Sequence, residues 1–149
     1  MSVQRTLVLC KPDSVQRGLV GRIVARFEDK GFKIVGLRML HVDEKLAHTH
    51  YQEHVEKPFF FELVSFITSS PIVAMAIEGE NAVEVVRGIM GVTNPQTAVP
   101  GTIRGDFGLN LTKNLVHGSD SLASAERELA LFFPPEEIYD YQLTLSSWL

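Results

Sequence analysis

Three features are scarce in this sequence: cysteine, long apolar runs and net charge. The one cysteine, Cys10, excludes an intrachain disulfide and suits a reducing compartment, and its apolar neighbours at 7–9 predict a buried structural thiol. No stretch approaches the roughly 18 apolar residues of a membrane helix, and the amino terminus lacks the apolar segment of a signal peptide. We therefore expect a cytoplasmic protein that is neither exported nor membrane-bound.

The formal net charge is only -4 over 149 residues. A charge of this size and sign provides no general attraction to nucleic acid or anionic lipid, so any bound anion must be held by a local group of cations. The chain also lacks internal repeats and Ser- or Gly-rich tracts, and 45% of its residues are hydrophobic. These values predict one compact domain, residues 1–149, that buries its own core.

What is present is a regular succession of strand-like and helix-like segments. Strands are predicted at 6–11, 32–40, 71–78 and 115–117, and helices at 15–30, 43–54, 59–68, 82–90 and 122–133. The third strand is apolar throughout and should be central and covered. In the second strand Val35, Leu37 and Met39 would share one face.

The first helix has the most regular pattern. Apolar residues recur at every fourth position from Val15 to Phe27, and Gly31 stands where a helix commonly ends. Asp13 and Ser14 precede the apolar stripe and would cap the helix. We therefore predict a single helix over 15–30.

The order of these segments indicates the fold class. Strand, helix, strand, helices, strand, helix, strand is typical of a ferredoxin-like βαββαβ sandwich, an α+β fold with a four-stranded, mainly antiparallel sheet covered by helices. A small doubly wound parallel sheet is the alternative. The helical hairpin and the small number of strands favour the sandwich.

His117 is the first candidate for chemistry. It ends a short apolar strand and is followed at once by Gly118, Ser119 and Asp120. Glycine lets the chain turn away while the imidazole stays at the rim of the sheet, so the position suits a nucleophile.

A long polar segment, 92–113, leads into this strand. It exceeds the roughly four to six residues usual for connections in compact domains, and connections this long are usually functional or disordered. Its prolines, glycines, Arg104 and amide or hydroxyl side chains suit an ordered polar wall.

Three cations and one carboxylate could form a functional site together with His117. Lys11 ends the first strand, Arg87 lies late in the helix before the long loop, and Arg104 lies within the loop. Each alone is more often a solvated surface charge, but together beside a histidine they would match a polyphosphate. Glu128 lies at the edge of the apolar stripe of the last helix and could orient the imidazole, although a solvent-exposed glutamate is the alternative. The members of that stripe are Leu122, Ala125, Leu129 and Phe132.

Polyphosphate binding would have to proceed without the usual phosphate-binding loops. The chain contains no G-x-x-x-x-G-K-[ST] or G-x-G-x-x-G motif and no protein-kinase signature. Side chains would then grip the phosphates, and the base would need only a stacking surface. Phe59, just after Pro58, is a candidate for that surface, and a plain core aromatic is the alternative.

A metal site is not predicted from the histidines of the second helix. His50 and His54 are four residues apart and His48 is close by, but there is no H-E-x-x-H motif and no evident third ligand. A partly solvated polar helix explains these residues better.

Four separate segments, in the same order along the chain, resemble the nucleoside diphosphate kinase family. They are Asn-Leu-Val-His-Gly-Ser-Asp-Ser at 114–121, Thr-Leu-Val-Leu-Cys-Lys-Pro-Asp at 6–13, Lys-Pro-Phe-Phe at 57–60, and the long loop from Thr93-Asn-Pro to Arg-Gly-Asp-Phe107. The likeness covers almost the full length. It departs from the family at Ser14, where glycine is frequent, at Cys10, and at the short carboxyl terminus.

The resemblance implies an activity and a set of roles. A terminal phosphate would pass from a nucleoside triphosphate to a diphosphate, with Mg²⁺, through a phosphohistidine on Nδ1 of His117. Phosphates would be contacted by Lys11, Arg87, Thr93 and Arg104. The nucleoside would be held by Phe59 at the base, by Lys11 and Asn114 at the ribose, and by Leu111. Tyr51 would lie near the histidine, and Glu128 and Ser119 would orient it.

Two questions stay open from the sequence. The resemblance favours a homohexamer over a tetramer or dimer, and exposed aromatic candidates at Tyr139, Tyr141 and Trp148 are compatible with assembly. The alternative function is a nucleotide- or nucleic-acid-binding regulator that keeps the scaffold without turnover. The intact His117 argues against it, because a pure binder needs no nucleophile.

Overall fold

The computed structural model of the chain describes residues 2–149, and its centre is one four-stranded antiparallel sheet. The strands are β1 (Val3–Cys10), β2 (Lys33–Leu40), β3 (Ile72–Glu80) and β4 (Val116–Gly118), in the spatial order β2-β3-β1-β4. β1 pairs antiparallel with both β3 and β4, and β2 pairs antiparallel with β3. This topology confirms the ferredoxin-like sandwich and excludes the parallel sheet.

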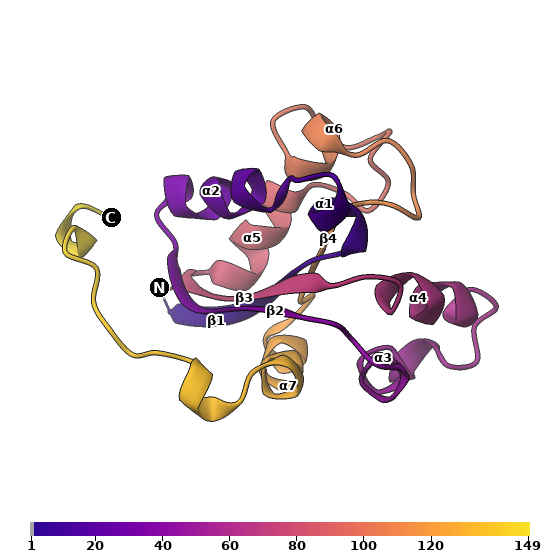
Figure 1. Cartoon of the computed structure of the whole chain (residues 1–149). Helices are drawn as coiled ribbons and strands as arrows, with labels where there is room; N and C mark the ends of the chain where they lie inside the picture. Colours follow the sequence, from indigo (N-terminus) through magenta and orange to yellow (C-terminus); the bar gives the residue numbers. More distant parts are fainter. Residues whose placement is uncertain (1) are drawn as a thin grey trace.

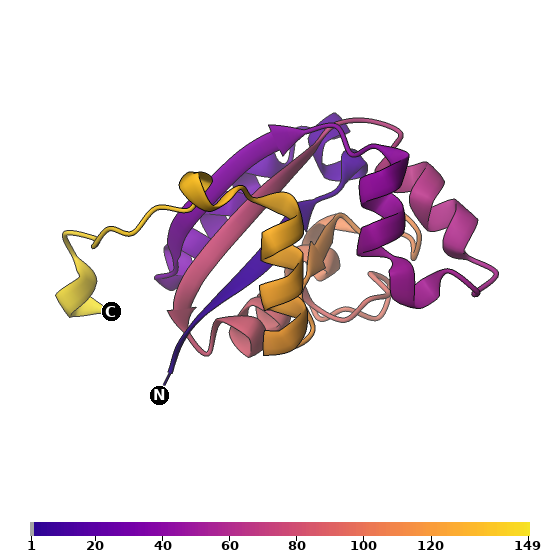
Figure 2. The same cartoon turned by 90° about the horizontal axis from the view of Figure 1, so that it is seen from below.

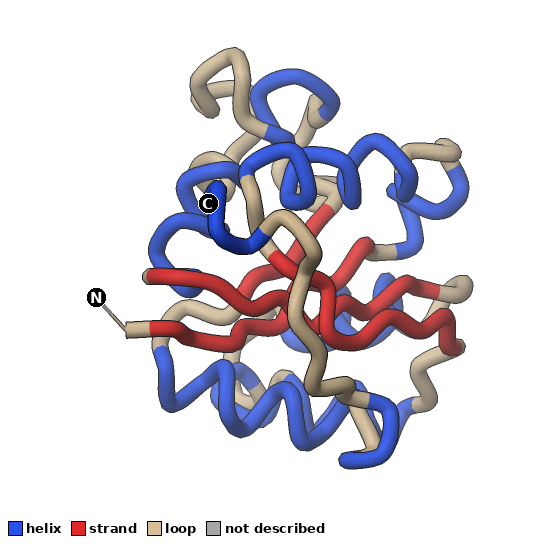
Figure 3. The backbone as a smooth tube through the Cα atoms, turned by 90° about the vertical axis from the view of Figure 1, so that its left-hand side faces the viewer, coloured by secondary structure: helices blue, strands red, loops and turns tan. Residues whose placement is uncertain are grey.

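Helices cover both faces of this sheet. They are α1 (Pro12–Gln16), α2 (Val20–Lys30), α3 (Glu44–His50), α4 (Phe60–Ile67), α5 (Ala82–Met90), α6 (Ile103–Phe107) and α7 (Leu122–Phe132). Figure 1 shows α2 and α5 on one face and α7 on the other, and Figure 2 shows α3 beside α4 at one end of the sheet. The layering is clearest in Figure 3, where the strands lie between two sets of helices. No helix among residues 2–149 is long and apolar enough to cross a membrane.

The two faces of β1 explain why its last four residues, 7–10, are apolar without alternation. Val8 and Cys10 point into the core beneath α2 and α5, while Leu7 and Leu9 point into the core beneath α7. All four are fully buried, which confirms the expectation of a buried thiol. Burying one such aliphatic side chain stabilises a fold by about 1.5–3 kcal/mol, so the strand anchors both cores.

The predicted single helix at 15–30 is wrong, because the chain forms two helices there. Gly18 has a φ of 68° and breaks the helix between Gln16 and Val20. Apolar residues continue at every fourth position across the break, and this spacing is why the sequence predicted one helix. The expected ending is confirmed, since Gly31 adopts a left-handed φ of 108°.

Asp13 and Ser14 do not cap a helix either. Both lie inside α1, whose first residue is Pro12, and both side chains bond the backbone of Leu115. Asp13 Oδ2 accepts from Leu115 N at 3.0 Å, and Ser14 Oγ donates to Leu115 O at 2.6 Å. Leu115 has a φ of 77°, unusual for a residue with a side chain, so these bonds hold a strained backbone directly before β4.

The prediction that Val35, Leu37 and Met39 share one face of β2 is also wrong. The register of β2 against β3 shifts between Ile34 and Gly36, so Val35 points into the core beneath α7. Leu37 and Met39 lie on the other face and are 56% and 63% exposed. A bulge inserts one unpaired residue and reverses which side chains face the core after it.

The remaining boundaries agree with the sequence to within about a turn. α3 ends at His50, and a short 3-10 helix (Gln52–His54) follows where the prediction continued the α-helix. The predicted loop at 92–113 contains the five-residue α6. Leu122, predicted as part of the apolar stripe of α7, is exposed. After α7 the chain passes along β2, where Tyr139 N donates to Val35 O at 2.8 Å.

Candidate active site

His117 and Glu128 form a fixed pair between β4 and α7. His117 Nε2 lies 2.8 Å from Glu128 Oε1, and Ser119 Oγ donates to the same oxygen at 2.8 Å. A carboxylate at Nε2 favours the proton on that nitrogen, which leaves the lone pair on Nδ1. The His117 side chain is 26% exposed, so the ring is both oriented and accessible.

The Glu128 carboxylate is buried and remains charged. Burial alone would raise its pKa, but the hydrogen bonds from His117 and Ser119 and the nearby imidazoles together hold it below its usual value. The local sequence provides this position, because Ser121 caps α7 by accepting from Ser124 N at 3.0 Å.

Gly118 brings β4 against α5. A β-carbon at this position would lie 2.5 Å from Met90 Sδ, closer than side chains approach. The strand therefore packs closely against the Met90 side chain of α5, and a larger residue at 118 would require that side chain to move.

Lys11, directly after β1, is a buried cation of the site. Its ammonium donates to Asn114 Oδ1. Burial lowers the pKa of Lys11 to about 8; the nearby Asp13 carboxylate opposes this shift and Arg104 adds to it. Asn114 Nδ2 in turn donates to Thr93 O at 3.0 Å, which ties the lysine to the long loop.

Arg104 is held by backbone carbonyls. Its guanidinium donates to Asn114 O at 3.1 Å, Gly91 O at 3.0 Å and Val116 O at 2.6 Å. A guanidinium has five N–H donors, so two stay available to a ligand. Burial, and to a lesser degree the charge of Arg87, lower the pKa of Arg104 to about 10, so it is positive at neutral pH.

Arg87 reaches the same region from α5. Its guanidinium donates to Gly118 O at 3.0 Å, directly after the histidine. Unlike Lys11 and Arg104, this side chain is exposed, so it stands nearer to solvent.

A cavity of about 420 Å³ unites most of the residues predicted from sequence. It is lined by Lys11, Tyr51, Phe59, Arg87, Thr93, Arg104, Asn114, His117 and Glu128. Ser119 lies behind the lining, bonded to Glu128, and Leu111 is exposed and does not line the cavity. The cavity thus brings Lys11, Arg87, Arg104 and Glu128 together with His117, as the sequence predicted, although it does not test their roles.

Two aromatic side chains shape the opening of this cavity. Phe59 precedes α4 and is 42% exposed, so it is not a plain core aromatic. Burial, aided by the charge of Glu128, raises the pKa of Tyr51 to about 12, so its hydroxyl stays protonated.

The sequence interpretation missed His50. It was assigned to a solvated polar helix, but it is only 5% exposed and its ring packs at 4.8 Å against His117. Burial, followed by the charges of its neighbours, lowers the pKa of His50 to about 3, so the ring is neutral. A signal was present, because His50 falls on the same helical stripe as Leu46 and Ala47.

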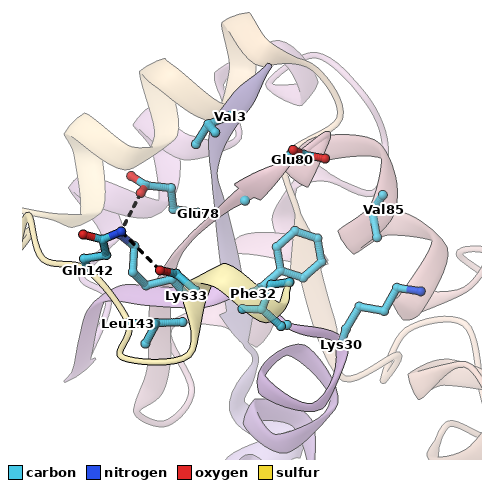
Figure 4. A pocket seen from close by; sticks show the side chains of 13 residues that line it. Val3, Lys30, Phe32, Lys33, Glu78, Glu80, Val85, Gln142 and Leu143 are labelled. Atoms are coloured by element: carbon cyan, nitrogen blue, oxygen red, sulfur yellow. Dashed lines mark hydrogen bonds and ion pairs between the residues drawn. The ribbon is translucent and has the colours of Figure 1, made fainter. Parts of the chain in front are cut away.

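A second cavity of about 410 Å³ lies beneath the carboxyl-terminal segment. Figure 4 shows a mixed lining, with apolar side chains such as Phe32, Val85 and Leu143 beside charged or amide side chains such as Lys30, Glu80 and Gln142. Its charged groups include the ion pair of Lys33 with Glu78 at 3.2 Å, but none of its lining residues is a histidine. The cavity beside His117 is therefore the candidate active site.

The fold and this site together define a class of protein. A ferredoxin-like sandwich places an accessible histidine on a carboxylate and faces it with cations from separate segments. This is the geometry of a phosphotransferase that acts on a polyphosphate.

Comparison with known proteins identifies the family within that class. The nucleoside diphosphate kinase family model matches residues 4–138. Proteins named nucleoside diphosphate kinase from Gloeobacter violaceus and Pelotomaculum thermopropionicum are 56% and 57% identical over 147 residues, with 99% of each chain covered. The chain belongs to the nucleoside diphosphate kinase family and is a nucleotide-binding phosphotransferase.

Solved structures agree with this assignment. A halophilic nucleoside diphosphate kinase from Halobacterium salinarum, in complex with CDP, is 54% identical with a TM-score of 0.96, covering 99% of this chain and 98% of that one. A nucleoside diphosphate kinase from Borrelia burgdorferi, in a transition state mimic with vanadate and ADP, is 39% identical with a TM-score of 0.92, covering 98% and 96%.

Proposed function

We propose that this chain transfers the γ-phosphate of a nucleoside triphosphate, typically ATP, to a nucleoside diphosphate, and that His117 carries the phosphoryl group between them. The observation that carries the proposal is the placement of the His117 ring, held at Nε2 by Glu128 and lining a cavity shared with Lys11, Arg87 and Arg104.

In the first half-reaction the Nδ1 lone pair of His117 attacks the γ-phosphorus in line. A nitrogen–phosphorus bond forms, the bond to the bridging oxygen breaks, and its electron pair leaves with the nucleoside diphosphate. Lys11, Arg87 and Arg104 spread the charge that develops on the phosphate oxygens. Glu128 stabilises the positive ring, because its carboxylate accepts a charge-assisted hydrogen bond from the N–H at Nε2 of His117.

The second half-reaction reverses the first with a different acceptor. A diphosphate in the same cavity attacks the phosphorus, and the nitrogen–phosphorus bond breaks to restore the neutral ring. One cavity for both nucleotides requires a ping-pong order.

Nucleotide recognition would then rest on few specific contacts. Phe59 offers a half-exposed ring on which any base can stack, so base selectivity should be weak. Lys11 and Asn114 would hold the ribose, and Thr93 would add a phosphate contact. Leu111 would approach the base from outside the cavity, and Tyr51 and Ser119 would steady the His117–Glu128 pair. The CDP and ADP complexes of the two structural relatives support this placement by analogy.

A divalent cation takes part in the reaction of this family, and we assign Mg²⁺ to that role. Among residues 2–149 the one group of three metal-ligating side chains is His50, His117 and Glu128. Two imidazoles and one carboxylate do not fit Mg²⁺, which prefers oxygen ligands and water. The cation would therefore arrive as part of the nucleotide substrate, bound to its phosphates.

The decisive test is His117→Ala. The variant should retain the fold and lose both half-reactions, because no other side chain replaces the nucleophile. Incubation with γ-labelled ATP should leave an acid-labile, base-stable label on the wild type only. Equal labelling of the variant would overturn the assignment.

The alternative, a regulator without turnover, is tested by mixing the protein with ATP and GDP. GTP formation supports the kinase, and nucleotide binding without GTP supports the regulator. A cytoplasmic location and assembly into a homohexamer are further parts of this proposal, carried by the family resemblance.

A further inference from the structure

His50 presents two polar atoms that the fold leaves unsatisfied. Neither Nδ1 nor Nε2 has a hydrogen-bond partner among residues 2–149, although the side chain is almost completely buried. An unsatisfied buried polar group costs roughly 1–3 kcal/mol, and such groups in native structures call for a specific explanation. The His50 ring also lines the cavity of the active site, so a ligand can reach it.

The surroundings of His50 fix its ring without bonding its nitrogens. The ring meets His117 and Phe132 edge to face, at 4.8 Å and 5.2 Å, and Tyr51 at 4.6 Å. Its backbone carbonyl accepts from Arg127 at 3.1 Å. The position of the ring is therefore set by packing in advance of any ligand.

Two other metal-ligating side chains lie next to these nitrogens. One ligand atom each from His50, His117 and Glu128 lie within 4.8 Å of one another. Ligand atoms around a tetrahedral zinc, with bonds of about 2.0–2.1 Å, are about 3.4 Å apart. The ligand atoms would have to approach one another by up to about 1.4 Å to reach this spacing, and we infer that the His117 and Glu128 side chains supply the movement while the His50 ring stays in place.

The donor set selects the type of cation. Two imidazole nitrogens and one carboxylate oxygen, with a fourth position open to water or substrate, form a recurrent zinc site. Zn²⁺ and similar borderline cations accept such ligands, whereas Mg²⁺ and Ca²⁺ require oxygen.

We propose that His50, His117 and Glu128 together bind a borderline divalent cation, with Zn²⁺ as the representative, and that this cation stops phosphoryl transfer. Coordination would use one ring nitrogen of His117 and leave the ring proton on the other, so no lone pair would remain on Nδ1 whichever nitrogen binds. The cation would also take the Glu128 oxygen that orients the ring. The inhibition rests on the proposed function, but the binding does not. Lys11, Arg87 and Arg104 line the same cavity and oppose a metal ion by charge repulsion, so binding depends on the three ligand side chains.

Binding is measured first, by isothermal titration of Zn²⁺ into nucleotide-free protein in the presence of excess Mg²⁺. The wild type should bind one zinc per chain, and His50→Ala should bind about 100-fold more weakly. His48→Ala is the matched control, since it removes an exposed histidine from the same helix and should bind as the wild type does. If His50→Ala does not fold, His50→Gln keeps a polar side chain there and serves the same comparison.

Activity is measured second, in the same buffer. Zn²⁺ should inhibit the wild type and His48→Ala, EDTA should reverse the inhibition, and the inhibition of the His50 variant should need about 100-fold more Zn²⁺. Equal zinc affinity in the His50 variant and the wild type, or no binding by the wild type, would overturn the proposal. Because binding is measured without nucleotide, a failure of the kinase assignment leaves that result intact.

Discussion

At the scale of single residues, burial changes the chemistry of Lys11 in a way that activity can report. Its pKa lies at about 8 in the folded protein against 10.5 for an ordinary lysine, chiefly because of desolvation. Between these values the unfolded chain binds the proton and the native chain does not, so stability rises with pH across that window. Below about pH 8 the ammonium is charged in both states and available to phosphate.

The first prediction concerns the alkaline limb of activity. kcat/KM, which reports the free enzyme, should fall as the pH rises through about 8, because neutral Lys11 loses its attraction for phosphate. Lys11→Gln should lower kcat/KM at neutral pH and remove this limb, whereas Lys57→Gln, at an exposed position, should keep it. The pKa of Lys11 in the folded protein is about 8. A wild-type profile of kcat/KM that stays flat up to about pH 10 would therefore contradict this role.

The second prediction concerns Glu128 as a positioning residue. Glu128→Gln removes the charge that stabilises the His117 ring, so kcat should fall about 10- to 100-fold while KM changes little. The exposed Glu126→Gln on the same helix is the control and should leave both constants unchanged. Steady-state kinetics separate the two effects, and a rise in KM alone would show that Glu128 serves binding instead.

Glu128 also links stability to pH. Its pKa is held below the usual value in the folded protein, so its contribution is present above the ordinary pKa of about 4.5 and is lost as the pH falls through the lower folded value. The carboxylate is thus ionised throughout the neutral range in which the enzyme is proposed to act.

At the scale of elements, the long loop depends on close backbone packing. A β-carbon on Gly105 would lie 2.1 Å from the backbone oxygen of Val99 and 2.8 Å from Thr102 Oγ1. The Thr102 side chain caps α6 by accepting a hydrogen bond from Gly105 N. Arg104 directly precedes this glycine. The close packing of Gly105 therefore helps to set the position of Arg104, the arginine that we propose contacts phosphate.

The third prediction follows from that packing. Gly105→Ala should destabilise the protein by about 1–3 kcal/mol and reduce kcat/KM, because the loop must move and carry Arg104 with it. Gly88→Ala is the control, since it lies in α5 with open space around it and should stabilise the protein by about 0.5–1 kcal/mol. Thermal unfolding and kinetics of both variants test the idea, which fails if Gly105→Ala behaves like Gly88→Ala.

The elements also show where local patterns succeed and fail. The bounds of α5 agree fully with the apolar spacing, and those of α7 differ by one residue, because each helix presents one uninterrupted face to the sheet. The break at Gly18 and the bulge at Val35 were missed, since both depend on a backbone conformation or a strand register that apolar spacing does not encode.

At the scale of the whole molecule, β2 forms an outer strand of the sheet. The carboxyl-terminal segment bonds it at Ile34 and Val35, but Leu37 and Met39 stay largely exposed. An exposed apolar edge strand is a template for pairing with another chain. This edge is therefore a surface at which copies of the chain could assemble.

The fourth prediction tests that surface. Light scattering should return a mass well above the 16.6 kDa of one chain, and close to six chains for the proposed hexamer. Replacing both Leu37 and Met39 with lysine should lower the mass, because buried charge opposes association. Leu122→Lys, at an equally exposed position on α7, should not change it. A wild type of monomeric mass would remove the assembly proposal and leave the chemistry untouched.

The sequence by itself determined the fold class, most element boundaries and most of the residues beside His117, although not His50, because periodicity and short motifs are local properties of a chain. The tertiary structure alone decided which residues meet. Lys11 and Asn114 are 103 positions apart yet share a hydrogen bond, and His50 packs on His117 instead of pairing with His54. The physical reason is that strand order and helix packing bring distant segments together, and no spacing along the chain records those contacts.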